Sequence, residues 1–80
     1  MPYVDEKARE RLNDGSIPKK AGELNYSITR MIWSYILLKG ESYQTYNDIM
    51  GALEGVKLEL YRRKIAPYED LRKEANGDVY

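Results

Sequence analysis

The chain has 80 residues, a formal net charge of zero from 13 basic and 13 acidic residues, and neither cysteine nor histidine. A chain this short buries only about 60% of the surface that its unfolded form exposes, so its own core is small. The missing thiols and imidazoles exclude disulfides, the usual zinc sites and the commonest general base at neutral pH. We therefore predict a single domain over residues 1–80 that is not an enzyme, with no catalytic residues, no metal site and no cofactor.

Charge and hydropathy also limit the partners of the chain. The balanced charge contains no long run of one sign, which predicts no binding to extended nucleic acid. The N-terminal sequence MPYVDEKARERL is charged, and no apolar run approaches the about 20 residues of a membrane span. We expect a cytoplasmic protein without a membrane partner. The chain has eight tyrosines and one tryptophan but no phenylalanine, a composition that favours subunit contacts and ligand walls.

The first predicted helix covers residues 3–12. Val4, Ala8 and Leu12 recur at helical spacing in a charged background, and a turn-forming sequence follows at 13–15. Its apolar side is thin, so we expect this helix to be the least stable element and to depend on what it packs against.

The second predicted helix covers residues 20–39 and has the most regular pattern in the chain. One apolar stripe runs through Leu24, Ile28, Met31, Tyr35 and Leu38, and Gly40 supplies a C-terminal stop. A second row on the other side of this helix contains Tyr26, Thr29, Arg30, Trp33 and Leu37. Because apolar and aromatic groups occupy two faces, we expect this helix to be covered on both.

The third predicted helix covers residues 46–65, with Thr45 as the expected N-terminal cap. Its apolar stripe comprises Tyr46, Ile49, Leu53, Val56 and Leu60. Gly51 and Gly55 lie one turn apart on another face. They indicate either the close approach of a second helix or simple tolerance of glycine.

Pro67 is expected to end this helix, because proline disfavours helical geometry in the residue before it, and to begin a fourth helix over residues 67–75. Residues 76–80 are then a tail. The pattern predicts an all-α fold, a small bundle of three to four helices that is completed by self-association.

The basic cluster Arg62, Arg63 and Lys64 is one candidate for ligand binding. Successive helical residues point about 100° apart, so the three cations cannot face one anion. Glu59 and Arg63 have the spacing of an ion pair, and we interpret most of the cluster as a solvated, self-paired face. Arg62 is the stronger candidate, because we expect it beside the two glycines rather than beside an acid.

Arg30 presents a second choice. Tyr26 and Trp33 lie one turn away on either side, which suits a subunit interface, cation–π stacking or a planar ligand. Arginine is also well shaped for binding phosphate through two hydrogen bonds. An 80-residue bundle has little room for a pocket of its own, so we expect any small-molecule site to be shared between subunits.

Several blocks of the sequence together resemble a family of short uncharacterised proteins encoded by tailed bacteriophages and prophages. The resemblance covers about three quarters of the chain and rests on the blocks GELNYSITR, SYQTYNDIMGALEGVKLELYRR, APYED and NGDVY. It implies a small phage protein, acting in the host cytoplasm, that binds a host protein or sequesters a small molecule of host immunity.

The first hypothesis is therefore a phage-type homo-oligomer that sequesters a small anionic ligand, such as a nucleotide immune signal, at a subunit interface. Arg30, Arg62 and Arg63 would bind phosphate, and Tyr26, Trp33 or Tyr68 would stack on a ring. The alternative is a protein–protein interaction module that inhibits or adapts a host or virion protein.

Overall fold

The computed structural model describes residues 4–79, and within this range every element is a helix and no residue forms a strand. This confirms the all-α fold class. The chain divides into two units, the first ending at Thr45 and the second beginning at Tyr46. Completion of the fold by self-association stays a prediction.

Helix α1 is Glu6–Asn13, so it begins later than the predicted residue 3. The reason is its cap: the Asp5 carboxylate accepts a 2.8 Å hydrogen bond from the Ala8 N–H, and the helix starts directly after Asp5. Val4, which we expected inside the helix, precedes it and is buried. The prediction for residue 3 lies outside the described residues.

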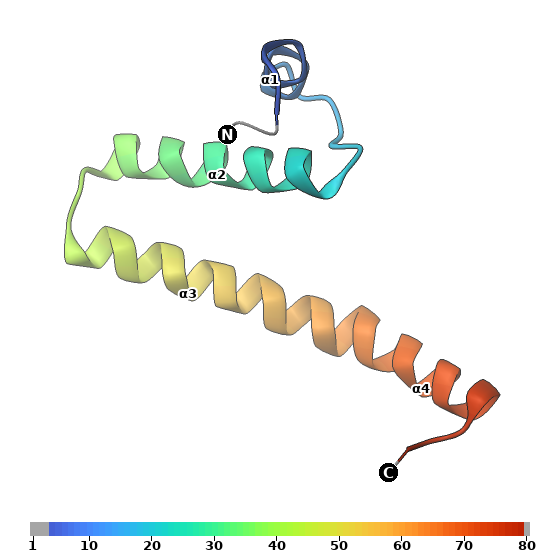
Figure 1. The fold of residues 1–80 in the computed structure, drawn as a ribbon. Coiled ribbons are helices and arrows are strands. Elements are labelled where there is room, and N and C mark those ends of the chain that lie inside the picture. The colour runs from blue at the N-terminus through green and yellow to red at the C-terminus, as the bar shows by residue number, and fades with distance from the viewer. Residues whose placement is uncertain (1–3, 80) are drawn as a thin grey trace. The chain divides into compact units, whose positions relative to one another are not determined.

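Helix α2 is Ala21–Lys39, close to the predicted range. It ends at Gly40 (φ 85°, ψ 153°), whose N–H bonds to the Ile36 carbonyl at 2.8 Å. Only glycine adopts such angles readily, which confirms Gly40 as the stop. Helix α1 packs beside α2 (Figure 1), and Leu12 is buried in this unit.

Helix α3 is Tyr43–Leu60, and the predicted start at residue 46 is wrong by one turn. Ser42, not Thr45, is the capping residue, because its hydroxyl oxygen accepts the Thr45 N–H at 3.0 Å. The Thr45 hydroxyl instead donates a 2.7 Å hydrogen bond to the Gly40 carbonyl. Thr45 is buried, and this hydrogen bond joins the first turn of α3 to the end of α2.

The helix does not break before Pro67, contrary to the prediction. A π-helical segment, η1 (Tyr61–Ile65), follows α3 directly, and α4 (Ala66–Asn76) continues from it in one rod (Figure 1). The Ala66 N–H donates to the Tyr61 carbonyl, five residues back, and Ile65 and Ala66 keep right-handed helical angles. A proline ring clashes with the carbonyl four residues earlier in an α-helix, and a wider π-turn relieves that conflict.

Little apolar surface is buried in the described residues. The buried apolar side chains are Val4, Leu12 and Ile49. Most large apolar side chains of α2, α3 and α4 are exposed instead. The fold therefore has two amphipathic units whose apolar faces are largely uncovered.

Candidate interaction surface

The junction between α1 and α2 is polar. The buried Glu23 carboxylate accepts a hydrogen bond from the Lys19 N–H at 2.9 Å and a second, charge-assisted one from the Arg11 guanidinium. Arg11 also donates to the Ile17 carbonyl at 3.2 Å. The Lys19 hydrogen bond, followed by the Arg11 contact, lowers the pKa of Glu23 below its ordinary value. This ion pair holds the loop between the two helices and is structural.

Tyr26 belongs to the same junction. Its hydroxyl donates a 2.9 Å hydrogen bond to the Asn13 side-chain oxygen at the end of α1. Tyr26 was predicted to stack on a ligand, and the structure assigns its polar end a role in holding α1 on α2. No pattern in the sequence pointed to Asn13, because the two residues meet only once the loop has folded back.

Arg30 and Trp33 remain as an exposed pair on α2. Trp33 keeps 58% of its surface exposed, and Arg30 is also exposed. Within residues 4–79 the Arg30 guanidinium has no ion pair or hydrogen bond. Since residues three apart are neighbours on a helix, the pair offers one cation and one aromatic ring to solvent.

Arg62 and Arg63 both bind Glu59. The Glu59 carboxylate lies 2.6 Å from the Arg63 Nε and 3.0 Å from the Arg62 Nη2. The expected Glu59–Arg63 pair is confirmed. The expectation that Arg62 has no acid beside it is wrong, because residues three apart on a helix also meet.

These two ion pairs change the electrostatics of the cluster. The contact with Arg63, followed by that with Arg62, lowers the pKa of Glu59. A single carboxylate thus offsets part of the positive charge that was expected to bind phosphate. Lys64 is exposed on the same turn.

The six predicted ligand residues are divided between the two units. Three of them, Tyr26, Arg30 and Trp33, lie on α2 in the first unit. The others, Arg62, Arg63 and Tyr68, lie in η1 and α4 of the second unit, where Tyr68 is exposed. The structure describes each set by itself.

A continuous row of exposed apolar side chains follows the second unit. We call it the apolar seam, and it comprises Leu53, Val56, Leu60, Ile65, Tyr68 and Leu71. The steps between its members are three or four residues, except for the five-residue step from Leu60 to Ile65. The seam was expected only as far as Leu60, and its continuation onto α4 was missed.

The π-helical segment explains this longer step. Leu60 and Tyr68 are eight residues apart, which in an α-helix is about 80° beyond two full turns at about 100° per residue. The π-turn accommodates one extra residue at Tyr61–Ile65 and so removes most of that offset. The widened turn thereby accommodates Pro67 and also keeps the seam on one face of the rod.

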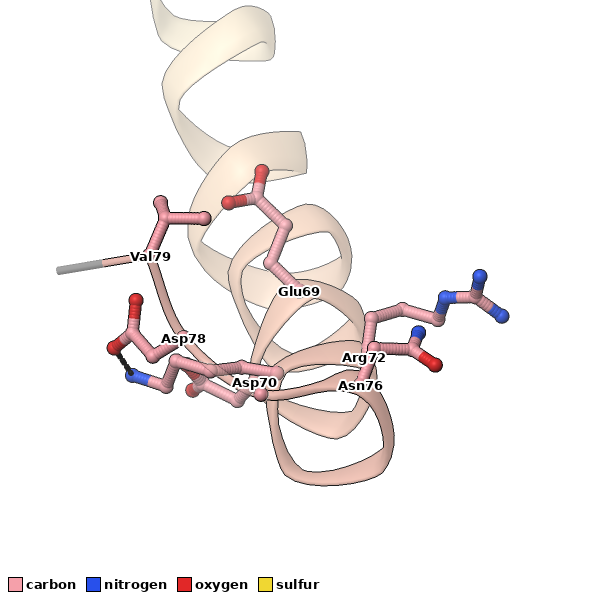
Figure 2. A pocket seen from close by; sticks show the side chains of 8 residues that line it. Glu69, Asp70, Arg72, Asn76, Asp78 and Val79 are labelled. Carbon is pink, nitrogen blue, oxygen red and sulfur yellow. Dashed lines mark ion pairs between the residues drawn. The ribbon is translucent and has the colours of Figure 1, made fainter.

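A shallow groove of about 460 Å³ lies at the end of α4. Its lining combines acidic and basic side chains with the C-terminal residues, as Figure 2 shows: Glu69, Asp70, Arg72, Lys73, Asn76, Gly77, Asp78 and Val79. Gly77 (φ 88°) turns the chain back, and the Asp78 carboxylate lies 3.5 Å from the Lys73 Nζ. Of the predicted tail, Asn76 belongs to α4, and residues 77–79 turn back along α4. The mixed charges give the groove no selectivity for an anion.

From 4 to 79, no group of three or more acidic side chains is placed to hold a metal ion. Among the described helices, none has the length and apolar character needed to span a bilayer.

Together these features define a class: an all-α protein with a helix pair in one unit and a long helix bearing an exposed apolar seam in the other. The model of a family described as a domain of unknown function, DUF6899, matches residues 1–79, and the chain belongs to this family. Searches of curated proteins and of solved structures gave no match. The resemblance to phage proteins stays a prediction.

Proposed function

We propose that this protein is an α-helical protein–protein interaction module whose binding surface is the apolar seam. The observation that carries the proposal is the exposure of this seam along one uninterrupted helical rod. Exposed apolar patches of this kind on small proteins mark interaction sites. The seam thus favours the second of the two sequence-based hypotheses over ligand sequestration.

Physical chemistry supports the same conclusion. An isolated helix is marginal in water, and most helix stability in proteins comes from packing of an amphipathic face. The rod from Tyr43 to Asn76 is about 50 Å long at 1.5 Å per residue. A partner that covers the seam removes apolar surface from water and stabilises the rod at the same time. Partners of this kind present a second amphipathic helix or a hydrophobic groove.

The biological setting is part of the proposal. With the resemblance to phage proteins, we assign the module to the cytoplasm of an infected bacterium, where a host protein or a virion component is the partner. The arginines beside the seam then meet acidic side chains of that partner.

Site-specific photo-crosslinking tests this function. A benzophenone amino acid at Val56 (69% exposed, on the seam) is compared with one at Leu58 (59% exposed, on another face). The two positions differ in face but little in exposure, so Leu58 is a matched control. We expect a discrete protein adduct in host cells from Val56 and at least a several-fold weaker one from Leu58. Equal labelling from both positions, or none from either, would refute the seam as a binding surface.

Sequestration of an anionic nucleotide at a subunit interface is a second candidate, and one observation favours it. The Arg30 guanidinium has no ion-pair partner within the described residues, and the exposed Trp33 ring lies one turn away. Such a pair can hold a phosphate and stack on a base. Arg62 and Arg63 join the site only by releasing Glu59.

Isothermal titration with a panel of cyclic dinucleotides and ADP-ribose derivatives tests the second candidate. We expect binding by the full chain and its loss in Arg30→Ala and Trp33→Ala, with Lys39→Ala as an exposed control on the same helix. If no member of the panel binds, the candidate is wrong.

A further inference from the structure

Two lysines interrupt the apolar seam. Lys57 lies one turn after Leu53 and one turn before Leu60, at steps of four and three residues. Lys64 lies four residues after Leu60 and four before Tyr68. Four residues nearly complete a turn of either an α-helix or the wider π-helix, so Lys64 stays in line with both of these seam residues. A molecule that covers the seam therefore covers or borders both ammonium groups.

The acids of the second unit are placed differently. Within residues 46–79, no acidic residue has a seam residue one turn away on both of its sides. Glu59, Glu69 and Glu74 each have a seam residue one turn away on a single side. Of these, Glu59 is already bound by Arg62 and Arg63. The charge in line with the seam is therefore positive.

Neither lysine has a strong partner in the described part of the chain. Lys64 is exposed, and its ammonium group forms no ion pair within residues 4–79. The Lys57 Nζ lies 3.9 Å from the Glu54 carboxylate, in a pair whose side chains are 77% and 58% exposed. An exposed pair at that distance contributes little to stability. A carboxylate from another molecule can thus join Lys64, or replace Glu54 beside Lys57, at small cost.

The two ammonium groups restrict what can cover the seam. The stem of a lysine is apolar and packs on an apolar surface, whereas its ammonium group has to stay hydrated or meet an opposite charge. A purely apolar partner offers no such charge. A second copy of the chain presents the same two lysines and no acid in line with its own seam. The partner of the seam therefore has to supply carboxylates.

We propose that the seam binds an amphipathic helix of another protein, whose apolar stripe is bordered by acidic residues about seven positions apart. Lys57 and Lys64 are separated by about 10 Å along the rod, at 1.5 Å per residue. Two carboxylates two turns apart on a facing helix match this spacing. Charges at such border positions set the choice of partner between paired helices. This partner is a more specific form of the proposed function and rests on it.

An anionic lipid surface matches the rod less well. Helices that lie on such a surface have a polar face rich in lysine and arginine. In residues 46–79, acidic residues outnumber basic ones. The positive charge is confined to the positions in line with the seam, where a facing helix reaches it.

A displayed library of amphipathic helices tests the proposal on the full chain. Leucine is fixed along one stripe of each helix, and every position that borders the stripe is free to be Glu or Lys. We expect selection on the unmodified protein to enrich Glu over Lys several-fold at border positions seven apart. Selection on the double variant Lys57→Glu with Lys64→Glu should reverse the preference to Lys. Binding of lysine-bordered helices also shows that the double variant is folded.

Fluorescence anisotropy of one selected acidic helix then measures the lysines separately. We expect Lys64→Glu to weaken binding about ten-fold or more and Lys64→Arg to retain it. Added salt should reduce this difference, because the charges lie at the border of the contact. Lys73→Glu is the matched control and should have little effect. It makes the same change of charge on the same rod, but Lys73 is two residues from Leu71 and so points about 160° away from it.

Three results from the library would overturn the inference: no bound helices, no preference for acidic over basic borders, or an acidic preference that survives reversal of both lysines. Two further results would assign the seam to another occupant and overturn it as well. One is sedimentation at twice the chain mass of 9.4 kDa by a dimer that the selected helices dissociate. The other is binding to phosphatidylserine vesicles from which the selected helices displace the protein.

The crosslinking test of the proposed function can fail separately. A Val56 adduct in host cells without a charge preference in the library would keep the interaction module and remove only the acidic helix. Acidic helices that bind the chain while Val56 gives no adduct in host cells would keep the charge preference and remove the cellular partner.

Discussion

Replacement of Leu12 by alanine tests how α1 is held in the first unit. Leu12 is 7% exposed, so the substitution removes three nearly fully buried carbon atoms. At about 0.8 kcal/mol for each buried carbon, the loss is about 2.4 kcal/mol. A cavity adds to this cost only where the surroundings cannot close, and a unit of two helices closes readily. We therefore expect a value near the transfer estimate.

The consequence is local. Helix α1 has 8 residues and depends on packing for its stability, so the lost energy appears as undocking of α1. A cost of about 2.4 kcal/mol raises the open population about 50-fold. Hydrogen exchange with mass spectrometry measures this directly, as faster exchange of the α1 amides.

The control for this experiment is Lys7→Ala, an exposed change on the same helix that should alter exchange little. Unchanged α1 protection in Leu12→Ala would show that Leu12 does not anchor the helix. An equal loss of protection over residues 46–76 would show that the two units unfold together, and would contradict the local reasoning.

Two further predictions concern other contacts. Gly40→Ala introduces no clash, since no atom lies within 4 Å of the added carbon, but it forces a φ of 85° on alanine. The free energy of unfolding, measured in urea, should therefore fall by about 1–3 kcal/mol. Gly51→Ala lies in helical backbone and should raise the same free energy by about 0.5–1 kcal/mol. Losses of equal size at both glycines would contradict this. The pKa of Glu23 is lowered in the folded state, so its ion pair contributes stability above the ordinary value of 4.5 that is lost as pH falls through the lower folded pKa. Protection of the α1 amides, measured relative to the intrinsic exchange rate at each pH, should therefore fall over that acid range in the unmodified chain and lose this dependence in Glu23→Gln. A retained dependence would exclude Glu23 as its source.

Much of the secondary structure was predictable because it depends on neighbours in the sequence. Three- and four-residue apolar spacing predicts α2 and most of α3, and the stop at Gly40 follows from its lack of a side chain. The start of α3 was misplaced because Ser42 and Thr45 both have cap-forming hydroxyls. Which hydroxyl accepts the helix N–H depends on the path of the connection from Gly40.

The candidate site was harder to predict than the helices. The Glu59–Arg63 pair follows from spacing, but the same rule also pairs Glu59 with Arg62, which removes the argument that Arg62 is free to bind phosphate. The apolar periodicity places Trp33 on a second face of α2, but it could not show whether that face is covered.

By itself the sequence determined an all-α chain, the helical periods and the glycine stops, because these depend on interactions within about one turn of helix. The tertiary structure alone decided that Arg11 joins Glu23 and that Tyr26 joins Asn13, since these partners lie 12 and 13 residues apart and meet only after the loop folds. It also decided that the helix continues through Pro67. A proline alone predicts a break, whereas the π-turn exchanges one hydrogen-bond register for another and keeps the apolar seam continuous.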